Sequence, residues 1–268
     1  MAFDGGTFSL EQCLEALIDY RGKTPRKVNS GRPLVTAKVV KGGRIRSPDE
    51  FIAECDYSAW MTRGFPEIGD VVLTTEAPLG EVGQIRSLPV ALAQRIVTLR
   101  GKEGVLDSDY LLYLLQSDSM QSKLHDRSTG TTVVGIKQSE LRKVEVQLPP
   151  LSEQRAVASA LKALDDRIDN LRQTNATLEA IAQALFKSWF VDFDPVRAKA
   201  EGREPEGMDP ATAALFPSEF EDSELGPIPR GWRVESMVSA FEINPKRTLK
   251  KGSIAKYLDM AGVPISGH

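Results

Sequence analysis

The sequence predicts an α+β fold, in which a mixed domain over residues 1–149 is followed by one long coiled-coil helix and by the start of a second, incomplete copy of the domain. Three observations carry this prediction. Short β-branched runs and amphipathic segments alternate before Pro149, apolar residues then recur at heptad spacing, and a segment near the end repeats the order of features near the start. A chain of 268 residues has room for one large domain, or for two small ones and a long helix.

The first domain is expected to begin with an amphipathic helix. Ser9 and Gln12 have the spacing of a capping box, and Leu10, Leu14 and Leu17 would line its apolar face. β-branched runs then predict strands at 34–40, 71–75, 81–85 and 95–99.

The rest of this domain follows from composition. Leucines predict a largely buried helix from Asp109 to about Leu124, and glycine and threonine predict a loop at 128–132. A last strand at 144–148 leads into Pro149-Pro150, where the domain is expected to end.

A long helix is predicted within residues 150–194. Ser152 is expected to cap it, Glu153 to complement its dipole, and Pro195 to end it. From 152 to 190 such a helix measures about 58 Å. Its coiled-coil seam is formed by residues at alternating steps of four and three, namely Val157, Leu161, Leu164, Ile168, Leu171, Asn175, Leu178, Ala182, Leu185 and Trp189.

Asn175 is the one strongly polar residue of this seam, and a polar residue at such a position fixes register and partner number at a cost in stability. The alternative is a helix packed along its own globular domain. The coiled coil is favoured, because helices of globular domains rarely exceed about 25 residues.

The net charge of −3 conceals a strong segregation of charges. Residues 21–46 contain nine basic residues and no acidic one, whereas residues 201–224 contain eight acidic residues and only one basic residue. A solvated face normally mixes both signs, so the basic tract at 21–46 favours a polyanionic partner such as nucleic acid over chance surface charge.

The end of the chain is predicted to restart the fold. An acidic linker rich in proline and glycine is expected at 195–228, followed by an incomplete second domain at 229–268. At an offset of 224 residues, segment 10–14 corresponds to 234–238, and each segment is preceded by an aromatic residue, Phe8 or Trp232. A second acid-free basic tract at 246–256 and a strand candidate, Tyr257–Met260, would follow.

The composition is that of an ordinary globular protein, with 41% hydrophobic and 26% charged residues. No apolar stretch is long enough to span a bilayer, and Met1–Gly6 lacks the features of a signal peptide. The two cysteines, Cys13 and Cys55, are typical of reduced packing residues. We therefore expect a cytoplasmic protein.

No catalytic constellation is evident. Gly22-Lys23-Thr24 lacks the upstream glycine of a phosphate-binding loop, and Asp192-Phe-Asp-Pro195 lacks the second proline and aromatic residue of an amino-methyltransferase motif. Two histidines without a Cys-x-x-Cys pair make a zinc site improbable. The carboxylates at 49–56 are better explained as a solvated helix start than as a nuclease site.

Three motifs give the chain a family resemblance. Leu148-Pro-Pro-Leu-Ser-Glu-Gln154, Ala184-Leu-Phe-Lys-Ser-Trp-Phe-Val-Asp-Phe-Asp-Pro195 and Gly226-Pro-Ile-Pro-Arg-Gly-Trp232 strongly resemble the specificity subunit of type I DNA restriction–modification enzymes. Leu34-Val-Thr-Ala-Lys38, Gly42-Gly43, Glu76-Ala-Pro-Leu-Gly80 and Gln94-Arg95 also look like that family. The resemblance covers nearly the whole chain.

The resemblance implies a non-catalytic protein with two target-recognition domains, each of which reads one half of a split DNA sequence. Spacer helices pair antiparallel between the halves, modification (methyltransferase) subunits dock on these helices, and the restriction (endonuclease) subunit joins the complex. S-adenosylmethionine, ATP and Mg²⁺ are expected on those partner subunits, and no cofactor or metal is expected on this chain.

This sequence departs from the family pattern, because it has one complete recognition domain, one spacer helix and only the start of a second domain. Either two chains pair as a homodimer through the spacer helix, or the chain is a truncated product. The alternative functions are a coiled-coil assembly or adaptor protein, or an inactive remnant without independent DNA recognition. A self-sufficient methyltransferase is disfavoured by the missing cofactor motifs.

Two groups of side chains are candidates for DNA contact. Lysine and arginine side chains neutralise phosphates, and the candidates in the basic tract are Arg21, Lys23, Lys38, Lys41, Arg44 and Arg46. Base edges are read by polar side chains on loops that flank strands, and the candidates are Thr36, Thr75, Glu76, Gln94, Arg95, Thr129 and Thr131.

Overall fold

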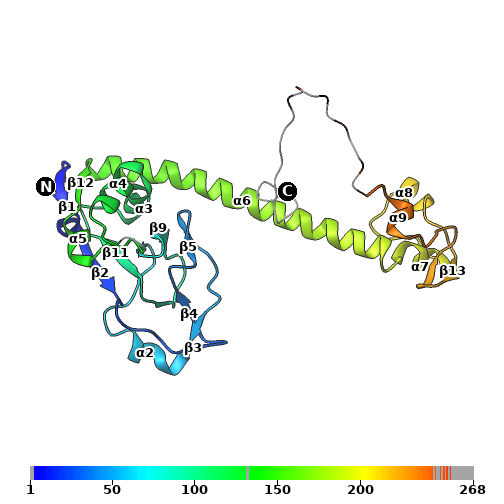
Figure 1. Cartoon of the computed structure of the whole chain (residues 1–268), viewed down its shortest axis with the longest axis horizontal. Helices are drawn as coiled ribbons and strands as arrows, with labels where there is room; N and C mark the ends of the chain where they lie inside the picture. Colours follow the sequence, from blue (N-terminus) through cyan, green and yellow to red (C-terminus); the bar gives the residue numbers. More distant parts are fainter. Residues whose placement is uncertain are drawn as a thin grey trace. The chain divides into compact units, whose positions relative to one another are not determined.

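The computed structural model describes residues 3–130, 133–243 and five single positions beyond them, 245, 248, 250, 252 and 254. The chain divides into two compact units, Met1–Gln173 and Thr174–His268. Both contain helices and strands, and the predicted α+β class with one long helix is confirmed (Figure 1).

A four-stranded antiparallel sheet organises the first unit. Its order is β2 (Leu14–Asp19), β11 (Ile96–Gly101), β8 (Val71–Thr75) and β9 (Leu79–Gln84). The sheet is buried on both faces, since Val71 and Leu73 belong to one hydrophobic cluster and Val72, between them, belongs to the other. This explains why β8 reads as a continuous buried run with no apolar–polar alternation.

The helix predicted at the start of the chain is only one turn long. The capping box between Ser9 and Gln12 is confirmed, with the Ser9 amide donating to the Gln12 side chain at 2.8 Å, but α1 ends at Cys13 (Leu10–Cys13). The prediction is wrong beyond that point. Leu17 and its neighbours form β2 because they pair with β11 at the edge of the main sheet.

The predicted helix at 109–124 is two helices, α3 (Ser108–Gln116) and α4 (Asp118–Asp126). Ser117 separates them with an extended backbone, because its hydroxyl caps α4 by accepting from the Met120 amide. A further short helix, α5 (Gln138–Arg142), precedes β12 (Glu145–Leu148), which pairs with β1 (Gly6–Ser9). These elements cover the cluster that contains Val71 and Leu73.

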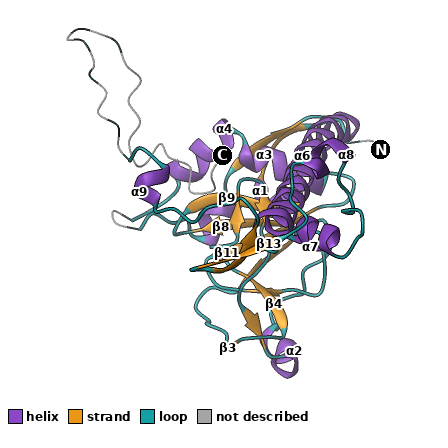
Figure 2. Ribbon diagram, turned by 90° about the vertical axis from the view of Figure 1, so that its right-hand side faces the viewer, coloured by secondary structure: helices purple, strands orange, loops and turns teal. Residues whose placement is uncertain are grey.

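A small second sheet packs on the other cluster. Its order is β10 (Ala91–Leu92), β4 (Arg32–Val35), β7 (Phe51–Ile52) and β3 (Lys27–Val28), and a 3-10 turn (Glu54–Asp56) and α2 (Tyr57–Trp60) follow β7. Figure 2 shows β3 and β4 beside α2, apart from the larger sheet.

The single strand predicted at 34–40 is divided between two strands, β4 and the next strand along the chain, β5. After β4 the chain turns, and β5 (Val40–Lys41) pairs with β6 (Arg44–Ile45). Gly42 and Gly43 join β5 to β6 at φ of 59° and 79°, a left-handed pair that a tight hairpin turn requires and that glycine adopts at little cost.

The long helix α6 (Leu151–Phe190) is continuous over 40 residues and confirms the prediction. It begins before Ser152, which lies in the first turn and not at the cap, and it ends before Pro195, which opens α7 (Asp194–Ala200). Gln154 is fully buried and fastens the helix start to the first domain. Its side chain accepts from the Asp107 amide at 3.0 Å and donates to the Val105 and Pro149 carbonyls.

The second unit contains α7, α8 (Pro210–Ala214), a hairpin of β13 (Phe220–Ser223) and β14 (Gly226–Pro229), and α9 (Met237–Ala240). Residues 195–228, predicted as a linker, thus contain regular elements. The elements of the second unit pack together through a cluster of aromatic rings, whose neighbouring centroids are 5.5–6.3 Å apart. The rings belong to Trp189, Phe190, Phe193, Phe216, Phe220 and Trp232.

The predicted internal repeat has a structural counterpart in one element. Ser236 precedes α9 as Ser9 precedes α1. The two serines are separated by three residues more than the predicted offset of 224. The strand candidate Tyr257–Met260 and most of the second basic tract lie outside the described residues.

Candidate nucleic-acid interface

A groove of about 450 Å³ in the first unit collects four of the predicted DNA-contact residues. It lies where the loop before β3, the end of β4, the end of β8 and the segment between β10 and β11 meet. The predicted residues that line it are Thr36, Lys38, Gln94 and Arg95. The further polar residues are Thr24, Lys27 and Glu50, which the sequence analysis did not name as DNA contacts.

The groove offers both hydrogen-bond donors and acceptors. Gln94 is half-buried and Arg95 is exposed, so an amide and a guanidinium line the groove. The Thr36 hydroxyl is buried, and among the described residues no group hydrogen-bonds to it. An unpaired buried polar atom is costly unless a ligand or water completes it, so a polar group that enters the groove would find a hydrogen-bonding partner in the Thr36 hydroxyl.

The backbone around the groove is strained at two positions. Ala77 has a φ of 52° and Arg95 a φ of 70°, a left-handed conformation that costs a residue with a side chain about 1–2 kcal/mol. Arg95 is held there by its carbonyl, which accepts from the Thr75 amide at 2.9 Å. Strain of this kind is concentrated at ligand-binding sites, where the surrounding fold maintains it.

The basic tract is partly neutralised by carboxylates that the fold brings next to it. Lys27 pairs with Glu50 at 2.7 Å, Lys38 with Asp49, and Arg32 with Glu54. The hydrogen bond from Lys38 lowers the pKa of the Asp49 carboxyl. The acidic residues at 49–56, which the sequence analysis assigned to a solvated helix start, therefore also balance the tract.

Other cations of the tract remain available to phosphate. Within the part of the chain that the structure describes, Lys23, Arg26, Lys41 and Arg46 make no ion pair. Arg21 donates to the Ile136 carbonyl at 2.8 Å.

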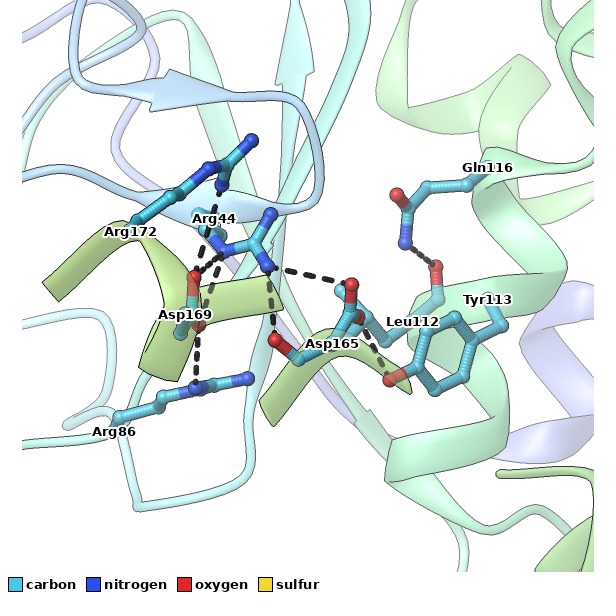
Figure 3. Close-up of polar contacts among 8 residues, drawn as sticks. All are labelled: Arg44, Arg86, Leu112, Tyr113, Gln116, Asp165, Asp169 and Arg172. Atoms are coloured by element: carbon cyan, nitrogen blue, oxygen red, sulfur yellow. Dashed lines mark hydrogen bonds and ion pairs between the residues drawn. The ribbon is translucent and has the colours of Figure 1, made fainter. Parts of the chain in front are cut away.

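Arg44, a predicted phosphate contact, is committed elsewhere in this structure. Its guanidinium pairs with Asp169 at 2.9 Å and with Asp165 at 3.3 Å, both on α6 (Figure 3). The Tyr113 hydroxyl donates to Asp165 at 2.9 Å. Burial, together with this neighbouring carboxylate, raises the pKa of Tyr113. Arg44, Asp165, Asp169 and Tyr113 thus join the β6 strand, α3 and α6, and we call them the Arg44 hub.

The hub extends to two further arginines. Arg86 and Arg172 each lie 3.7 Å from Asp169. Sequence reasoning missed the hub, although two aspartates four residues apart on a predicted helix indicate one acidic face.

We expect the hub to stabilise the first unit modestly. Asp169→Asn should lower the free energy of unfolding by about 1 kcal/mol, because its pairs are partly exposed and screened. Urea unfolding of the chain would measure the change. Asp166→Asn, at an exposed neighbouring position, is the matched control, and equal midpoints for the two variants would contradict the prediction.

The remaining predicted base contacts lie around the end of β8. Glu76 pairs with Arg95 at 3.3 Å. Thr75 is buried, and its hydroxyl has no hydrogen-bond partner within the part of the chain that the structure describes. Thr129 is exposed on a loop that bridges to Gly135, which in turn bridges to Glu76. Thr131 lies outside the described residues.

The predicted coiled-coil seam is exposed along α6. Leu164 is 63% exposed, Leu171 49% and Leu178 58%. Val157, Leu161, Ile168, Leu185, Asn175 and Ala182 are also exposed, and Trp189 is half-buried against Phe216. The residues of α6 that face the first domain, Gln154, Ala158, Asp165 and Asp169, lie beside this seam, so docking of the helix leaves it uncovered.

The described residues contain neither a candidate metal site nor a candidate membrane span. The ranges 3–130 and 133–243 and the single positions beyond contain no group of three or more His, Cys, Asp or Glu side chains that could hold a metal ion. Over the same residues, no helix is both long and apolar enough for a membrane span.

Comparison with known proteins gives one consistent match. Residues 62–180 match the model of the type I restriction modification DNA specificity domain. The chain is 30% identical over 226 residues to the type I restriction enzyme MjaIX specificity subunit of Methanocaldococcus jannaschii, which covers 84% of this chain and 46% of the relative. It is 29% identical over 208 residues to the HindI specificity subunit of Haemophilus influenzae, with coverages of 63% and 45%.

Among solved structures, the HsdS subunit from Thermoanaerobacter tengcongensis is similar with a TM-score of 0.46 at 22% identity, over 69% of this chain and 44% of that chain. The present chain spans a little under half the length of the curated relatives that it matches.

Proposed function

Because this chain belongs to the family of type I restriction–modification specificity subunits, we propose that it is a DNA-recognition protein without catalytic activity of its own. It binds double-stranded DNA sequence-specifically and directs methyltransferase and endonuclease subunits to a split target. The observation that carries this proposal is the groove that gathers Thr36, Lys38, Gln94 and Arg95, with an unpaired hydroxyl and a strained backbone at its wall.

The chemistry of the groove supports base reading. Amide, guanidinium and hydroxyl groups are the side-chain types that hydrogen-bond base edges in the major groove of DNA. Lys23, Arg26, Lys41 and Arg46, which form no ion pair with the residues that the structure describes, supply phosphate contacts, which give affinity and register but carry no sequence information.

The partners follow from the family. We propose that modification subunits dock on the spacer helix and that a restriction subunit joins them. S-adenosylmethionine, ATP and Mg²⁺ would then be bound by those partners. The exposed seam on α6 supports a helical partner, and a second copy of this chain is the occupant that we propose for it.

A gel shift at two salt concentrations tests the proposal. The full chain, mixed with its modification subunit, is titrated into a pool of random duplexes at 50 and 200 mM salt. Binding should weaken by tenfold or more at the higher salt, because each phosphate contact releases counterions. A coiled-coil adaptor with a merely solubilising basic face would bind no duplex at either salt.

A further inference from the structure

The ion pair between Arg95 and Glu76 has a geometry that leaves part of the guanidinium unused. The contact runs from the Arg95 Nε to the Glu76 Oε1 at 3.3 Å. Over the residues that the structure describes, Glu76 is the single carboxylate within ion-pair distance of Arg95. The ion pair therefore uses the Nε of Arg95. The N–H groups of the two terminal guanidinium nitrogens remain available to donate hydrogen bonds to another group.

Two parallel donors of this kind match one base in particular. Guanine presents two acceptors side by side in the major groove, O6 and N7, and a planar guanidinium reaches both at once. Adenine presents a donor next to N7, and thymine and cytosine offer no such pair of acceptors. A lysine in the same place would supply charge without the fork of donors.

The position of Arg95 is held before any DNA binds. Its backbone has a φ of 70°, its carbonyl accepts from the Thr75 amide, and the next residue, Ile96, is buried in the core. Arg95 is 54% exposed and Glu76 38% exposed at their side chains, so the pair stands at the rim of the groove. Anchoring a long side chain at its base and at its Nε reduces the freedom that it would lose on binding.

We propose that Arg95 reads one guanine of the target through O6 and N7, and that Glu76 is a positioning residue that holds the guanidinium for this contact. This inference rests on the proposed function, because it names the base that the groove recognises.

The experiment first selects duplexes from a random pool with the full chain and its modification subunit, and then repeats the selection with variants. The wild type should enrich a motif with an invariant guanine. Arg95→Lys should reduce the preference for guanine at that one position by about tenfold or more, while the other positions keep theirs. Glu76→Gln should weaken the preference at the same position without changing the preferred base.

Controls separate a local from a general effect. Arg86→Lys, an exposed arginine that pairs with Asp169 outside this groove, should leave the motif intact. Equal binding of a non-specific duplex by wild type and Arg95→Lys should show that overall affinity is unchanged.

A modified base gives a second measurement that uses the wild-type protein. Replacing the guanine by 7-deazaguanine removes N7, and should weaken wild-type binding while leaving the binding of Arg95→Lys nearly unchanged, since coupled groups lose their effect together.

Three outcomes would count against the proposals. If the wild type enriches no sequence, the proposed function itself fails. If it enriches a motif that Arg95→Lys reproduces, or that 7-deazaguanine does not weaken at any guanine, the guanine assignment fails and the function stands. If Glu76→Gln selects a different base, Glu76 reads DNA directly and is not a positioning residue.

Discussion

Leu164→Asp combined with Leu171→Asp should convert a self-associated chain into a monomer. Both leucines belong to the seam and are largely exposed on α6. Burying side chains of this size against a partner helix contributes roughly 1.5–3 kcal/mol each, and a charge in the seam would lose that contribution and add the cost of its own desolvation. Sedimentation at micromolar concentration would measure the change.

The control variant introduces two aspartates on a face of α6 that lies beside the seam. Ala156→Asp and Ala163→Asp are spaced by the same heptad, and both positions are exposed and lie outside the seam. This variant should sediment as the wild type does. A wild-type chain that is already monomeric would refute the prediction, and so would loss of association in the control.

Self-association would also constrain the DNA target. Two identical chains related by a twofold axis carry two identical grooves, so the target would consist of two inverted, identical half-sites. Mapping of methylated sites in cells that supply the modification subunit would test this, and an asymmetric target would contradict it.

The groove shows which part of a candidate site the sequence can predict. Thr36, Gln94 and Arg95 were selected because they flank strands, and Lys38 because it belongs to the basic tract. They meet because the ends of β4 and β10, which are parallel neighbours, open onto the same groove. The family resemblance, to which the segment from Pro149 to Gln154 contributes, is confirmed by the family model.

The hub and the first helix show what the sequence could not predict. Counting charges over 21–46 cannot reveal that Arg44 is paired with Asp165, which lies 121 residues later. Leucines at 10, 14 and 17 fit a helix by spacing alone, and only pairing with β11 turns the last two into strand residues. In both cases the deciding interaction is distant in the chain.

Neutralising the unpaired cations of the basic tract should have the largest effect on DNA affinity. Lys23→Gln, Lys41→Gln and Arg46→Gln remove three charges that, among the described residues, are engaged in no ion pair. Each phosphate contact contributes about 0.9 to the slope of log K against log salt, so the slope should flatten by about 3. Affinity for every duplex sequence at low salt should fall by at least tenfold.

A matched triple variant separates this effect from a change in net charge. This control variant removes the same charge from exposed positions outside the tract, by Lys102→Gln, Lys123→Gln and Lys143→Gln. Its slope of log K against log salt should differ from that of the wild type by no more than about 0.9, the contribution of one phosphate contact. Fluorescence anisotropy of a labelled duplex over a series of salt concentrations measures both variants. Equal flattening in the two would mean that the tract acts only through overall charge. An unchanged slope in the tract variant would place the phosphate contacts on another face, whereas the selective loss places the DNA backbone on the basic tract.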